Sequence, residues 1–190
     1  MRHLPPPYAT RLLTAGGAWV IQTDKQKCWR ANWSFIHPGY RQAKIRKVEY
    51  WEQDNIPVIK DFPDIETAYR DLESSLLKAQ NFSVRRKFGW EKWFGKAVEL
   101  LHNTSPVLPF YADLLPSTFE NVKSRQLLAG VLQAWVFGGL GSWNDMYITD
   151  CSLETEYQQI SKSLYVSVIQ AVGAVTNSTA EDRLMALPKS

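Results

Sequence analysis

The stretch WVFGGLGSWND, residues 135–145, decides the fold because it separates two long amphipathic segments of the chain. Three of its residues are glycines, and a glycine adopts positive φ without the steric cost that a side chain imposes. We therefore expect Gly138 or Gly139 to end the preceding helix, and Gly141 to permit a second tight bend. The pattern predicts a helix–loop–helix corner whose two helices pack antiparallel, because the connection is short and both apolar stripes need covering.

The polar end of this stretch allows two interpretations. In the structural one, Trp143 plugs the helix ends, Trp135 is buried between the helices, and short polar side chains bond freed backbone groups. In the functional one, the loop binds a partner, since a corner made only for turning rarely includes a tryptophan. The candidate structural or partner-binding residues are therefore Gly138, Gly139, Gly141, Trp143, Asn144 and Asp145.

Helical periodicity extends outward from the loop in both directions. Apolar residues at helical spacing predict helices over residues 65–80, 90–102, 117–137 and 153–176. Asp64 is the expected N-cap of the first, Ser117 to Glu120 form an expected capping box for the third, and Asn177 is the expected C′ residue of the last. Residues 83–89 are expected to form a basic loop, and residues 103–116, with three prolines, a linker.

The N-terminal third has the period-two alternation of strands. Residues 18–22 and 27–36 predict a hairpin with a turn at 23–26, because Trp29, Ala31, Trp33 and Phe35 alternate with smaller or polar residues. A second pair is expected at 47–51 and 56–59, with a turn at 52–55 and with Pro57 confining the last strand to a sheet edge. The sequence thus predicts an α+β fold, a small N-terminal antiparallel sheet followed by a mainly helical bundle sharing one core.

The predicted domain organisation is a single α+β domain over residues 17–177. The proline run at the start of the chain predicts a loosely ordered segment at 1–16, and residues 178–190 are expected to form a tail. Two glycines interrupt the apolar run that follows the prolines, which argues against a signal peptide, and no apolar run approaches a membrane span. We therefore expect a cytoplasmic protein with no membrane segment.

Positive charge is concentrated near the N-terminus. The net charge of +3 divides into +6 over residues 1–60 and −3 over residues 61–190. A candidate basic face comprises Lys44, Arg46, Lys47, Arg85, Arg86 and Lys87. With Trp29 or Trp33 beside Arg30, cations and aromatics together suggest an alternative function as a nucleic-acid-associated accessory protein, because bases stack on such pairs.

The sequence lacks the spacing patterns of common catalytic and metal sites. Its three histidines are not spaced as metal ligands, and Cys28 and Cys151 form no CxxC pair. The glycines of residues 138–141 are not followed by the Lys-Ser/Thr pair of a phosphate-binding loop. We expect no enzyme activity, no metal and no cofactor.

The glycine–tryptophan stretch also carries a resemblance. Together with the earlier run GWEKWF, residues 89–94, it resembles small, largely uncharacterised bacterial proteins, some regarded as immunity proteins encoded beside polymorphic or contact-dependent toxins. The resemblance covers residues 85–176. It implies a non-enzymatic protein that binds and blocks one cognate toxin, and no binding residue transfers with it.

Overall fold

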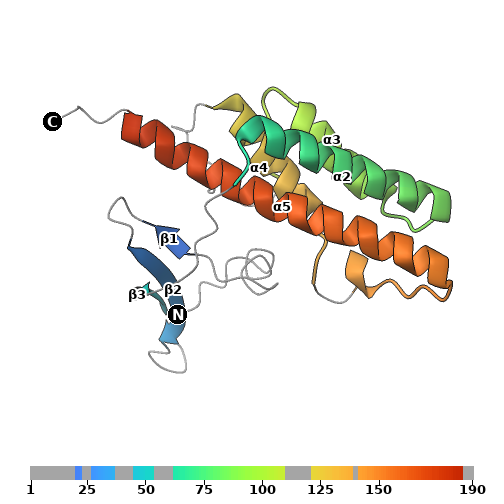
Figure 1. Ribbon diagram of the computed structural model, residues 1–190, viewed down its shortest axis with the longest axis horizontal. Coiled ribbons are helices and arrows are strands. Elements are labelled where there is room, and N and C mark those ends of the chain that lie inside the picture. Colours follow the sequence, from blue (N-terminus) through green and yellow to red (C-terminus); the bar gives the residue numbers. More distant parts are fainter. Residues whose placement is uncertain are drawn as a thin grey trace. The chain divides into compact units, whose positions relative to one another are not determined.

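The computed structural model describes residues 20–22, 27–36, 45–53, 62–109, 121–138 and 141–185. The chain divides into two compact units, residues 1–60 and residues 61–190. The first contains an antiparallel sheet and the second a bundle of helices (Figure 1), which confirms the predicted α+β fold class. The shared core and the single domain over 17–177 stay predictions, and the segment 1–16 lies outside the described residues.

The sheet of the first unit has the strand order β1-β2-β3. Its strands are β1 (Val20–Gln22), β2 (Cys28–Ile36) and β3 (Ile45–Gln53), each antiparallel to its neighbour. The predicted hairpin of β1 and β2 is confirmed.

Strand β3 is longer than expected. The predicted turn at 52–55 is wrong in its first half, because Glu52 pairs with Trp29 and its carboxylate lies 2.8 Å from Lys27 Nζ. These contacts to β2 and to Lys27 just before it hold Glu52 in the sheet, and Gln53 pairs with Cys28. The expected strand at 56–59 lies outside the described residues.

Helix α2 (Ile65–Arg86) begins as predicted and ends later. Asp64 Oδ1 accepts a hydrogen bond from the Thr67 amide at 2.7 Å, which satisfies one of the unpaired N–H groups at the helix start. The predicted end at residue 80 and the basic loop from residue 83 are wrong, because Phe82 and Ser83 are fully buried and tertiary packing continues the helix. Lys87 ends it in the left-handed conformation, with φ of 55°.

Helices α3 (Glu91–His102) and α4 (Val122–Ala134) follow. The predicted helix at residues 90–102 is confirmed, with Trp90 at its N-cap position. Asn121 caps α4, accepting a hydrogen bond from the Ser124 amide at 3.1 Å, while the expected capping box at Ser117 to Glu120 lies outside the described part of the chain. The predicted continuation of α4 to residue 137 is wrong, since the helix ends at Ala134.

Helix α5 (Cys151–Met185) is much longer than predicted. Asp150 Oδ1 accepts a hydrogen bond from the Leu153 amide at 2.9 Å, so the helix starts slightly earlier than expected. The predicted end at Asn177 is wrong, and the first part of the expected tail is helical. The physical reason is that no glycine or proline occurs between Gly173 and Pro188, so nothing local stops the helix.

The helices of the second unit pack as a bundle around one apolar core. Helix α5 contacts α2 and α4, and α3 contacts the same two helices. In Figure 1, α2 and α5 run side by side in opposite directions. Two glycines permit close approach, since a Cβ on Gly130 would lie 2.6 Å from Leu101, and one on Gly173 would lie 2.1 Å from the Phe62 ring.

Candidate functional site

The glycine–tryptophan loop, residues 135–145, leaves α4 as buried extended chain. Trp135, Val136 and Phe137 are all buried, and the Trp135 backbone is already non-helical. Gly138 has φ of 88° and Gly141 has φ of 78°, so the predicted positive φ of Gly138 and the second bend are confirmed. The expectation that Gly138 ends the helix is wrong, because α4 already ends at Ala134. Gly139 lies outside the described residues. A short 3-10 helix, η2 (Trp143–Asp145), completes the loop before α5 begins.

Hydrogen bonds tie Trp143 to both sides of the corner. Its amide donates to the Val136 carbonyl at 3.2 Å, which closes the loop onto its own start. Its carbonyl accepts from the Tyr157 hydroxyl at 2.6 Å, and its indole Nε1 donates to Ser161 Oγ at 2.7 Å. Since Tyr157 and Ser161 lie on α5, these bonds fix the loop to the last helix.

The indole of Trp143 is the centre of an aromatic cluster. Its exposed fraction is 0%. Its ring centroid lies 5.0 Å from that of Phe94 on α3, 5.3 Å from that of Tyr157 on α5, and 6.2 Å from those of Phe82 on α2 and Trp90. Such edge-on and tilted aromatic pairs add stabilisation beyond area burial. Trp143 therefore joins three helices, and its side chain is not available to a partner.

The polar residues of the loop support its own geometry. Asp145 Oδ2 accepts hydrogen bonds from the Ser142 amide at 3.0 Å and from Ser142 Oγ at 3.3 Å. These bonds cap η2, so Asp145 bonds a free backbone amide at the corner, as expected of its short polar side chain. The Asn144 side chain lies outside the described set. Among the loop residues whose burial is described, Gly141 and Asp145 are exposed, and Gly138 and Ser142 are partly exposed.

The candidate basic residues of the sheet are only partly described. Lys44 lies outside the described residues, and Arg46 belongs to β3 by its backbone, with its side chain outside the description. Lys47 Nζ lies 2.5 Å from Glu49 Oε1 on the same strand. This ion pair offsets the positive charge of Lys47 locally.

The candidate basic residues of the bundle lie at the C-terminal end of α2. Arg85 forms an ion pair with Glu156 on α5, and Arg86 Nη2 lies 3.8 Å from the other oxygen of that carboxylate. Lys87 is exposed. These arginines thus join α2 to α5, and a single basic face formed with the sheet residues stays a prediction.

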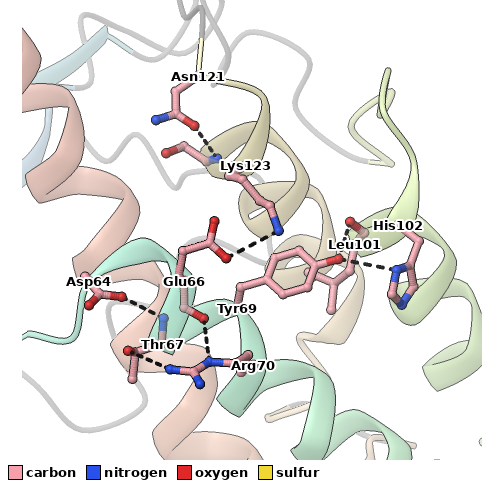
Figure 2. Close-up of polar contacts among 10 residues, drawn as sticks. Asp64, Glu66, Thr67, Tyr69, Arg70, Leu101, His102, Asn121 and Lys123 are labelled. Carbon is pink, nitrogen blue, oxygen red and sulfur yellow. Dashed lines mark hydrogen bonds and ion pairs between the residues drawn. The ribbon is translucent and has the colours of Figure 1, made fainter.

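A polar cluster at the other end of α2 joins three helices (Figure 2). The Tyr69 hydroxyl donates to the Leu101 carbonyl at 2.7 Å and lies 3.5 Å from His102 Nδ1. His102 Nε2 lies 2.6 Å from Glu73 Oε1. Lys123 Nζ lies 4.2 Å above the Tyr69 ring. Burial, and then the charges of nearby glutamates, raise the pKa of Tyr69, so its hydroxyl remains a hydrogen-bond donor at neutral pH.

The titratable groups do not form a recognisable catalytic arrangement in the described part of the chain. Cys28 is buried in β2, and Cys151 is an exposed thiol at the first residue of α5. Among the residues that the structure describes, no three His, Cys, Asp or Glu side chains lie together as a metal ion would require. Within the same residues, no helix has both the length and the apolar character needed to cross a membrane.

The sheet carries exposed large apolar residues that were not among the candidate residues expected from the sequence. Trp51 is 57% exposed, Tyr50 54% and Ile21 55%. Trp51 lies opposite Arg30 in the register and therefore shares one face of the sheet with it, whereas Tyr50 lies on the other face, opposite Ala31. Two consecutive aromatics in a strand point to opposite faces, but the sequence does not show which face is covered, so the exposure of Trp51 could not be predicted from it.

The two sequence runs that carry the family resemblance meet in the aromatic cluster. Trp90 and Phe94 come from residues 89–94, Trp143 comes from the glycine–tryptophan loop, and their rings are in contact. Phe94 and Trp143 are fully buried and Trp90 is partly buried, so these two runs pack against each other within the bundle. The immunity-protein resemblance itself stays a prediction. No family model, curated protein or solved structure matches this chain.

Proposed function

We propose that this chain is a non-enzymatic cytoplasmic protein that binds and neutralises one cognate bacterial toxin. The observation that carries the proposal is the pair Arg30 and Trp51, which are exposed and opposite each other on neighbouring strands. Tryptophan and arginine are enriched among the residues that dominate binding energy at protein interfaces. An exposed indole on a regular strand also loses little conformational entropy when a partner covers it.

The contact between the two resemblance runs supports a shared scaffold and assigns them no binding role. Trp143, Phe94 and Trp90 are used in packing, and the fully buried rings among them cannot touch a toxin. In a family of proteins that each block a different toxin, the residues that choose the partner must lie outside such a core. The exposed sheet residues meet that requirement.

Nucleic-acid binding is the alternative that the charge distribution favours. Residues 1–60 carry a net charge of +6. In the described sheet, however, Lys27 is paired with Glu52 and Lys47 with Glu49, so phosphate groups would have to displace carboxylates. Nucleic-acid binding predicts retention on heparin that falls steeply with salt.

The direct test is co-expression with the product of an adjoining toxin-like reading frame. The toxin alone should stop growth, and the toxin together with this chain should allow growth and co-purify as a complex. Tyr147→Ala, which changes a residue that is 90% exposed near the loop, serves as a control that should still rescue. Absence of both rescue and complex formation would contradict the proposed function.

A further inference from the structure

We infer that the partner docks on the Arg30–Trp51 face of the sheet and that it presents an acidic protein surface there. By this face we mean the side of β2 and β3 that carries Arg30, Asn32, Lys47, Glu49 and Trp51, which opposite pairing and period-two alternation place together. The inference rests on the proposed function and adds the binding surface and the chemistry of the partner.

The geometry places a cation and an indole within reach of the same ligand. Arg30 lies on the central strand, opposite Val20 on β1 and Trp51 on β3. Opposite side chains in an antiparallel pair have Cβ atoms about 5 Å apart. Arg30 is exposed and has no ion-pair partner among the described residues. Its guanidinium can therefore donate two hydrogen bonds to a carboxylate in a bidentate contact, while Trp51 supplies apolar area.

Charge complementarity identifies the kind of surface that fits. The unit that contains this face has a net charge of +6, which attracts an acidic surface over distances of about 10 Å at moderate salt. A second copy of this chain would bring two basic units together, so self-association through this face is disfavoured. An acidic partner gains both the long-range attraction and the contact with Arg30.

The carboxylates on the sheet favour a protein over a nucleic acid. Asn32 and Glu49 are opposite each other on this face, and Glu49 holds Lys47 in an ion pair. A phosphodiester backbone would meet Glu49 within the proposed contact area, whereas a protein surface can place a neutral or basic side chain there. The face thus has a mixture of charge, amide and indole that suits a protein interface.

The first experiment asks whether the face is open in the free protein. Fluorescence quenching by iodide and by caesium is measured on the wild type and on Trp51→Phe, and the difference isolates Trp51. We expect iodide to quench this component at least about twofold more strongly than caesium, because the surroundings are basic. A Trp51 component that neither ion quenches would overturn the inference, since the chain itself would then cover the face.

The second experiment measures the affinity for the toxin of the proposed function, the product of an adjoining toxin-like reading frame, in an inactivated form. Arg30→Glu and Trp51→Ala should each weaken binding at least about tenfold, and the Arg30→Glu effect should shrink at high salt. Lys78→Glu makes a comparable charge change on an exposed residue of α2, and Tyr147→Ala removes an exposed ring outside the sheet, so neither should weaken binding. Circular dichroism verifies that all four variants are folded.

The outcomes separate the two proposals. If the wild-type protein fails to bind, the proposed function is wrong and the docking surface is wrong with it. If the wild type binds and the two sheet variants bind equally well, the docking surface alone is wrong. If a single-stranded oligothymidylate binds and Arg30→Glu abolishes that binding, the face recognises nucleic acid and the protein partner is refuted.

Discussion

Replacing Trp143 by alanine removes the side chain that joins α2, α3 and α5. A buried tryptophan removes about 150–250 Å² from water, worth about 4–6 kcal/mol at about 25 cal/mol per Å². A compact denatured state lowers this figure by about 10–40%. The lost hydrogen bond from Nε1 to Ser161 adds about 1 kcal/mol. Together these terms give about 3–6 kcal/mol. We therefore expect Trp143→Ala to lower the free energy of unfolding by about 3–6 kcal/mol, which overlaps the range of about 3–5 kcal/mol found for large aromatic truncations.

The assay is urea unfolding followed by far-ultraviolet circular dichroism, because eight tryptophans complicate fluorescence. Trp143→Phe keeps an aromatic ring but loses the bond to Ser161, and it should cost about 1–3 kcal/mol. Tyr147→Ala is the matched control, since Tyr147 is 90% exposed a few residues away, and its effect should stay within about 0.5 kcal/mol.

The opposite result would be a free energy of unfolding for Trp143→Ala within about 1 kcal/mol of the wild-type value, with the same slope against urea concentration. Such a result would mean that the indole does not hold the helices together. If the same variant also lost its partner, the glycine–tryptophan loop would be a binding site.

Three further predictions concern single contacts. Tyr157→Phe removes the bond to the loop carbonyl and should cost about 1–2 kcal/mol in a urea titration. The pKa of Tyr157 is raised, mainly by burial, so the stabilising effect of its hydroxyl should be present below about pH 10 and be lost as the pH rises further. The free energy of unfolding of Tyr157→Phe should therefore fall less steeply at alkaline pH than that of the wild type. The hydrogen bond from the Thr67 amide is the main cause that lowers the pKa of Asp64, so the stability that the Asp64 carboxylate contributes should be present above about pH 4 and be lost at lower pH. The melting temperature of Asp64→Asn should therefore fall less steeply than that of the wild type as the pH is lowered. Gly173→Ala would place a Cβ 2.1 Å from the Phe62 ring and should cost about 1–3 kcal/mol by thermal unfolding, with Phe62→Ala relieving the clash.

Local patterns predicted the elements whose boundaries are set by local chemistry. The alternation in residues 27–36 predicted β2, and the carboxylate of Asp64 predicted the start of α2. The glycines at 138 and 141 predicted the corner, because positive φ is a requirement that the residue type reveals.

Boundaries set by tertiary contacts could not be predicted in this way. Helix α2 continues to Arg86 because Phe82 is buried by residues distant in sequence. Helix α4 ends at Ala134, and the Trp143 amide then bonds the Val136 carbonyl, a contact that periodicity does not encode. The apolar stripe through residue 137 therefore predicted burial but not helix.

The candidate site was likewise predicted only in part. The sequence selected the loop because its residue types are unusual, and the structure shows that Trp143 is used in the core. Trp51 was not selected, because its exposure depends on which face of the sheet is covered and not on its neighbours in the sequence. Unusual residue types in the sequence thus identified the corner between α4 and α5, but they did not identify the exposed residues of the sheet.

Hydrogen–deuterium exchange of the protein with and without the inactivated toxin tests the central claim most directly. The claim is that the glycine–tryptophan loop builds the bundle while the sheet binds the partner. We predict added protection in β2 (Cys28–Ile36) and β3 (Ile45–Gln53) on complex formation, and unchanged exchange in residues 135–150. Protection confined to residues 138–150, with the sheet unchanged, would contradict the account.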